Sequence, residues 1–247
     1  MTPSSHIDVS VDDDIMRIRL NRPEKKNAIN QAMYDAMSAA LLDADVRDDV
    51  RVIVLLGVEG CFTAGNDLAD FNSRKPKGLS KAAEFLLVLH DLKKPLVAAV
   101  SGLAVGIGTT LLLHCDLVYA SDDTRFRLPF VNLGLCPEAG SSLMLPAISG
   151  HRAASELLLL GGFFDSEMAI KNGLVNQAMP DDQLLSFAFE QARQLTLQPT
   201  EALLETKRLL KSDSYDEVKQ RILDESEVFS RLLQNDESKA ARQRLAG

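Results

Sequence analysis

Two glycine-containing segments could present backbone amides to a negatively charged oxygen. Gly60–Leu68 follows the apolar run Val50–Leu56, and Gly102–Gly108 follows the apolar run Leu96–Val100. Glycine lets the backbone turn so that its amides face a ligand, and the amide of Ile107 is expected at the positive end of a following helix. Either segment alone is also compatible with an ordinary tight turn. Two amide sites at the ends of neighbouring strands, however, predict an oxyanion hole.

Other combinations of reactive residues fit known sites less well. Gly106 and Gly108 could begin a dinucleotide-binding fingerprint, but Leu111 stands where that pattern needs glycine or alanine. The triplet His114–Asp116 lies at a predicted helix–strand junction, where its side chains would point in different directions. We therefore expect no metal site and no nucleophilic site there.

The composition restricts the classes of partner. Of the 247 residues, 46% are hydrophobic and 25% are charged, which is typical of a globular chain with a sizeable core, and the net charge of −8 disfavours nucleic acid as a partner. The three cysteines lack CxxC spacing, so we expect no disulfide framework and a cytoplasmic location. No segment has the length of a membrane span, so we expect no membrane partner.

The elements that position the two glycine segments can be predicted from hydrophobic spacing. Alternating residues between Ile7 and Leu20 predict a β-hairpin, and Asn30 is a suitable N-cap for a helix that runs to about Ala44. Strands and helices then alternate through 50–56, 79–92, 96–100, 108–114 and 116–120. This order predicts an α/β fold with a parallel, helix-covered sheet.

Beyond Ser149 the pattern becomes mainly helical. Helices are predicted over 153–160, 166–172, 181–197, 200–211 and 215–233, and the only strand predicted in this part is 175–178. The last helices carry apolar stripes that one α/β core need not bury fully, which favours packing or self-association.

Three segments carry a recognisable pattern: Leu20–Ile29, Ala64–Leu68, and Ala98–Gly108 followed by Cys115-Asp116. Together they resemble the crotonase (enoyl-CoA hydratase/isomerase) superfamily over nearly the whole chain. The resemblance implies a crotonase fold of repeated ββα units, with residues 1–195 as the core that binds acyl-CoA and 196–247 as a helical trimerisation region. It also implies an acyl-CoA thioester substrate, a homotrimer or a dimer of trimers, and no cofactor, because coenzyme A is part of the substrate.

The resemblance assigns functional residues at the matching positions. The backbone amides of Asn66 and Ile107 occupy the family's two oxyanion positions. Substrate contacts, mostly through the backbone, are implied for Lys26, Ala28, Ala64, Gly65, Asp67, Leu68, Gly106, Thr110 and Phe130. Lys26 lies where family members meet the adenosine part of coenzyme A, although lysines in turns are often only solvated. Asp67 could also act structurally by holding its loop.

The chain departs from the hydratases of this family at their acid–base positions. Those hydratases carry two glutamates that handle water, and this chain has Thr110 and Phe130 there. Glu138 stands where hydratases usually carry glycine, which resembles the peroxisomal-type 3-enoyl-CoA isomerases. In those enzymes one glutamate moves a proton between C2 and C4, which implies the same role for Glu138. Apolar neighbours would raise the pKa of Glu138, whereas a helix start would lower it.

Three functions are compatible with these residues. The leading interpretation is isomerisation of 3-enoyl-CoA to trans-2-enoyl-CoA in fatty acid or related acyl-CoA degradation. The alternatives are an enoyl-CoA hydratase and, from another class, an acyl-CoA-binding module without turnover. For Glu138 itself, the simpler alternative is a first-turn helix glutamate that only complements the helix dipole.

Overall fold

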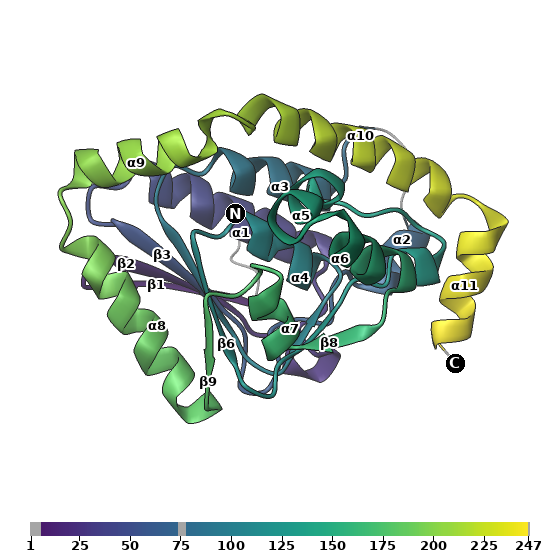
Figure 1. Ribbon diagram of the computed structural model, residues 1–247, viewed down its shortest axis with the longest axis horizontal. Helices are drawn as coiled ribbons and strands as arrows, with labels where there is room; N and C mark the ends of the chain where they lie inside the picture. Colours follow the sequence, from purple (N-terminus) through teal and green to yellow (C-terminus); the bar gives the residue numbers. More distant parts are fainter. Residues whose placement is uncertain (1–5, 74–77, 247) are drawn as a thin grey trace.

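The computed structural model describes residues 6–73 and 78–246, whose strands form two sheets (Figure 1). The larger sheet has the order β1-β2-β3-β4-β6-β9 and consists of β1 (Ile7–Asp12), β2 (Ile15–Leu20), β3 (Val52–Leu56), β4 (Leu96–Val100), β6 (Leu117–Ser121) and β9 (Gln177–Met179). β1 and β2 form the predicted antiparallel hairpin, and every other neighbouring pair is parallel. All residues of β3 and β4 are buried, as expected for parallel strands covered on both faces.

The described helical segments are α1 (Gln31–Val46), α2 (Leu68–Ser73), α3 (Lys81–Asp91), α4 (Ile107–Thr110), α5 (Ser141–Ser149), α6 (His151–Ser155), α7 (Ser166–Lys171), α8 (Asp181–Thr196), α9 (Thr200–Ser212), α10 (Tyr215–Leu233) and α11 (Asp236–Ala246), with shorter turns η1 (Pro23–Lys25), η2 (Leu111–His114), η3 (Val131–Leu133) and η4 (Glu156–Leu160). Ile53 and Leu55 of β3 join the apolar cluster that contains α1 and α3, whereas Val52 and Val54 join the cluster under α8. Side-chain alternation along β3 thus serves two helical layers.

A smaller sheet of β5 (Leu103–Val105), β7 (Arg125–Arg127) and β8 (Phe163–Asp165) corrects two expectations. β5 lies inside the glycine segment that was expected as a loop, and β8 lies beyond Ser149, where only 175–178 was predicted as a strand. Strands of three residues are too short to show alternation in the sequence. Pairing with partners more than 20 residues away defines them.

Two helical predictions also need correction, and α11 was missed. The 108–114 segment is one turn of α-helix, α4, followed by the 3₁₀ turn η2, and 153–160 is α6 followed by the π-helical turn η4. α11 was not predicted, because its mostly polar sequence shows little apolar periodicity.

The C-terminal helix α10 lies across the molecule against α3 and α5 (Figure 1). Its face toward the core buries Val218, Ile222, Phe229 and Leu233, and it also buries a charged residue, Glu225. Residues from the last part of the chain therefore cover the end of the core that carries the candidate site. Among the described residues, no helix combines the length and apolar character needed to cross a membrane.

Candidate active site

The two glycine segments lie side by side as paired backbone. The amide of Thr63 donates to the carbonyl of Leu103 (2.8 Å), and the amide of Val105 donates to the carbonyl of Thr63 (3.0 Å). Gly65 has a φ of +92°, and a Cβ atom there would lie 2.7 Å from the carbonyl oxygen of Val105. Glycine is required at this position because the two loops touch through their backbones.

The proposed oxyanion donors follow directly after this contact. On either side of Asn66, Ile29 donates to the carbonyl of Gly65 (2.8 Å) and Asp67 donates to the carbonyl of Ile29 (2.9 Å). Within the described residues, neither the amide of Asn66 nor that of Ile107 has a hydrogen-bond acceptor. Backbone amides that point away from their own strand or helix are available to an incoming oxygen.

Glu138 is buried, with 7% of its surface exposed, and the hydroxyl of Thr110 donates to its Oε1 (2.7 Å). Burial raises the pKa of Glu138 to about 8; the Thr110 hydrogen bond opposes this rise, and the charge of Glu225 adds to it. Gly140 is the N-cap of α5, so Glu138 precedes the helix. The first-turn interpretation of Glu138 is therefore wrong, and burial, rather than a helix dipole, dominates its electrostatics.

Tyr34 is a site residue that the sequence did not reveal. Its hydroxyl donates to the Oδ1 atom of Asn66 (2.7 Å), and its side chain is buried. Burial, followed by the nearby charge of Glu138, raises the pKa of Tyr34 well above its usual value, so the hydroxyl keeps its proton. Helical spacing in α1 places Tyr34 on the buried face but gives no sign that this face meets the loop of Asn66.

A cavity of about 260 Å³ borders Tyr34, Asn66 and Glu138, whereas Ile107 and Thr110 are not among the described residues that line it. Its polar end is lined by Tyr34, Asn66 and Glu138, and apolar walls come from α3 and α10 through residues that include Ala83, Leu86, Ile222 and Phe229. A polar end with an apolar wall suits a thioester that carries a hydrocarbon chain.

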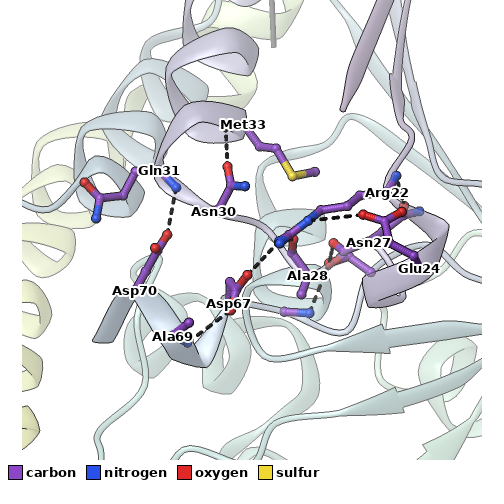
Figure 2. Close-up of polar contacts among 12 residues, drawn as sticks. Arg22, Glu24, Asn27, Ala28, Asn30, Gln31, Met33, Asp67, Ala69 and Asp70 are labelled. Carbon is purple, nitrogen blue, oxygen red and sulfur yellow. Dashed lines mark hydrogen bonds and ion pairs between the residues drawn. The ribbon is translucent and has the colours of Figure 1, made fainter. Parts of the chain in front are cut away.

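An ion pair joins the first two of the three patterned segments, Leu20–Ile29 and Ala64–Leu68 (Figure 2). Arg22 Nη1 donates to Asp67 Oδ2 (2.6 Å) and to the carbonyl of Ala28 (2.9 Å), while Asp67 Oδ1 accepts from the amide of Ala69 (3.0 Å). Although burial opposes the shift, Arg22 and the Ala69 amide hold the pKa of Asp67 below its usual value. The Asn27 side chain adds hydrogen bonds to the carbonyls of Cys61 and Phe62 (both 3.0 Å). Asp67 thus holds its loop.

The other predicted site residues are not among the described residues that line the cavity. Gly65 and Gly106 flank the two donor amides, and Thr110 contacts Glu138. The carbonyl of Ala28 accepts from Arg22, the amide of Ala64 donates to the carbonyl of Lys26 (2.9 Å), and Leu68 begins α2. Phe130 is buried and does not line the cavity. It belongs to the main apolar cluster, and its substrate contact stays a prediction.

Comparisons with known proteins identify the family. The family model for enoyl-CoA hydratase/isomerase matches residues 11–246. Human enoyl-CoA delta isomerase 2 is 37% identical over 211 residues, which are 82% of this chain and 53% of the human protein. The 2,3-dehydroadipyl-CoA hydratase of Escherichia coli is 31% identical over 233 residues, which are 92% of this chain and 90% of that protein.

Solved structures agree with these matches. OdaA from Pseudomonas aeruginosa superposes with a TM-score of 0.95 and 43% identity, covering 98% of this chain and 99% of OdaA. This chain spans about half the length of the human and rat delta isomerase 2 proteins that it matches. Because the family model matches almost the whole chain, this protein belongs to the enoyl-CoA hydratase/isomerase family and has the crotonase fold.

Proposed function

We propose that the protein isomerises 3-enoyl-CoA to trans-2-enoyl-CoA, with Glu138 as the only proton shuttle. The observation that carries this proposal is the buried Glu138 carboxyl beside Thr110, the residue that stands where a hydratase of this family would hold one of its two glutamates. Relatives of this chain include proteins named as delta isomerases. One carboxyl group suffices to move one proton, whereas hydration also requires a water molecule to be activated.

The proposed reaction has two proton transfers. The amides of Asn66 and Ile107 bind the thioester oxygen, and the Glu138 carboxylate removes a proton from C2. The electron pair of the broken C–H bond moves into the enolate, where the two amides stabilise the negative charge on oxygen. Glu138 then returns the proton to C4, and the double bond is left between C2 and C3. A carboxyl group whose pKa is about 8 returns a proton readily near neutral pH.

Hydration is the second candidate, because the 2,3-dehydroadipyl-CoA hydratase of Escherichia coli is also a relative. The two are separated by giving purified protein 3-enoyl-CoA and trans-2-enoyl-CoA of equal chain length and comparing kcat/KM. We expect isomerisation to exceed hydration by at least about tenfold, or ~1.4 kcal/mol. Hydration at an equal or higher rate would overturn the proposal. Tight binding without exchange of solvent deuterium into C2 or C4 would instead indicate a binding module.

The proposal extends to oligomeric state, cofactor and cellular location. Residues 196–247 would form trimers or dimers of trimers through exposed apolar side chains such as Leu209 and Leu210 on α9, which are 60% and 82% exposed. Light scattering should give a multiple of 27.0 kDa. The reaction needs no cofactor besides the coenzyme A of the substrate, and the three free cysteines fit a reducing cytoplasm.

A further inference from the structure

The loop that carries Glu138 has an unfavourable backbone. Ala139 has a φ of +65° and Gly140 a φ of +69°, so two consecutive residues are left-handed, and the first of them has a side chain. A left-handed conformation of alanine persists only where surrounding contacts impose it. The contacts that impose it on Ala139 also set the direction in which Glu138 leaves the backbone.

Glu225 of α10 supplies one of these contacts. Its Oε2 accepts a hydrogen bond from the amide of Gly140 (2.6 Å), and its Oε1 accepts one from the amide of Ser142 (2.9 Å). Glu225 is 6% exposed, so its carboxyl group has been taken out of water to serve this loop. The N-cap of α5 is a glycine, which has no side chain to accept from the first amides of the helix. Glu225 of α10 supplies that acceptor instead.

His114 holds the other end of the same peptide group. Its Nε2 lies 2.8 Å from the carbonyl oxygen of Ala139, and because that oxygen can only accept, Nε2 must carry the hydrogen. Burial lowers the pKa of His114 to about 3, so the ring is neutral. The peptide between Ala139 and Gly140 is therefore gripped at its oxygen by His114 and at its nitrogen by Glu225.

We propose that Glu225 is a positioning residue which, with His114, clamps the Ala139–Gly140 peptide and thereby aims the Glu138 carboxyl group into the cavity. The proposal rests on the isomerase function proposed above. It assigns to the C-terminal helix α10 a direct part in orienting the proton shuttle, beyond its packing on the core.

The same pair of carboxyl groups interacts electrostatically. The charge of Glu225 contributes to the raised pKa of Glu138, after burial. Burial also raises the pKa of Glu225, and its hydrogen bonds and the charge of Arg221 on α10 oppose that rise. The other ionisable groups near the pair are Tyr34 of α1, which keeps its proton, the neutral His114, and the Cys136 thiol, whose pKa burial and the charges of both glutamates raise to about 11. Removing the charge of Glu225 should therefore lower the pKa of Glu138.

The test compares Glu225→Ala, Glu225→Gln and the control Glu227→Gln in the full chain. Glu227 is exposed on the same helix, so its substitution should change nothing. Glu225→Ala removes both acceptors, and we expect kcat to fall about tenfold or more with KM within about twofold, because a misdirected base costs rate more than binding. Glu225→Gln keeps one acceptor and should recover part of that loss, while the pH dependence of kcat/KM moves to lower pH.

A second readout does not need turnover. The ¹³C resonance of the Glu138 carboxyl, assigned by its absence in Glu138→Gln, should titrate at lower pH in Glu225→Gln than in the wild type. An unchanged titration, or wild-type kcat in Glu225→Ala, would overturn the proposal. If Glu225→Ala does not fold, Glu225→Gln decides through the titration. If the wild type shows no isomerase activity, the proposed function fails, and the titration still decides the part played by Glu225.

Discussion

The two halves of the candidate site are held in place by different means. The oxyanion half consists of backbone amides, and its geometry comes from strand-like pairing between residues 63–65 and 103–105 and from close contact at Gly65. The Glu138 half consists of one side chain on a strained loop, which is fixed by side chains from α4, η2 and α10. The first half therefore depends on the absence of a side chain at Gly65, where the two loops touch. The second half depends on the side chains that contact the Glu138 loop.

This difference predicts different sensitivities to mutation. In the oxyanion half, side chains that do not hold the loops as Asp67 and Asn27 do can change as long as the backbone amides stay. In the Glu138 half, conservative changes at several distant positions should matter. The following substitutions test the contrast, from the largest expected effect to the smallest.

Glu138→Gln should have the largest effect. The amide keeps the shape and can still accept from Thr110, but it cannot take a proton, so kcat for isomerisation should fall by about 10²–10⁴. Affinity for the CoA ester should stay within a few-fold, as measured by calorimetry. Turnover equal to that of the wild type would remove Glu138 from the mechanism and end the contrast between the two halves.

Ile107→Pro and Ile107→Val separate backbone from side chain in the oxyanion half. Proline removes the amide hydrogen at the first position of α4, and loss of one oxyanion donor should lower kcat about 10²–10³-fold. Valine keeps the amide and should stay within a few-fold of the wild type. Circular dichroism must show that both variants fold. Equal damage from the two would mean that packing at Ile107, rather than its amide, is what matters.

The pH dependence of stability tests the buried charge of Glu138. Its folded pKa of about 8 lies above the usual 4.5, so its contribution to stability is complete below about pH 4.5 and is lost as the pH rises through 8. Glu138→Gln has no such loss. Between pH 5 and pH 9 its free energy of unfolding should therefore gain roughly 3–5 kcal/mol relative to the wild type. Urea titrations across this range measure the gain. If the free energies of unfolding of the two proteins change with pH in parallel, the pKa of Glu138 is not raised in the folded protein.

Gly65→Ala and Ala139→Gly should change the stability of the fold in opposite directions, although both positions have a left-handed backbone. A Cβ at residue 65 would meet the Val105 carbonyl at 2.7 Å, so the first change should destabilise the fold by about 1–3 kcal/mol and widen the oxyanion half. At residue 139 glycine relieves backbone strain, so the free energy of unfolding should rise, by less than about 1 kcal/mol, while kcat falls slightly as the loop loosens. Thermal melts measure the direction of each change in stability, and kcat measures the effect of each substitution on the site. A stable, fully active Gly65→Ala would contradict the close approach of the loops.

The same contrast explains what could be predicted from the sequence. The hairpin, the helix capped by Asn30 and the parallel strands were predictable because local spacing sets them. The glycine segments pointed to the amide of Ile107, and the family resemblance pointed to that of Asn66. Tyr34, His114 and Glu225 could not be recognised. Each acts through a residue that is 25 to 85 positions away, and no local pattern records such a contact. The short strands β5 and β8 were missed for the same reason.

The position of α10 has a consequence for synthesis of the protein. This helix supplies a wall of the cavity through Ile222 and Phe229 and the acceptor for the amide of Gly140 through Glu225. A ribosome makes the sheet, both glycine segments and Glu138 long before it reaches residue 233. A nascent chain can therefore fold most of its core without holding a finished site, and the proposed reaction becomes possible only after α10 has been made.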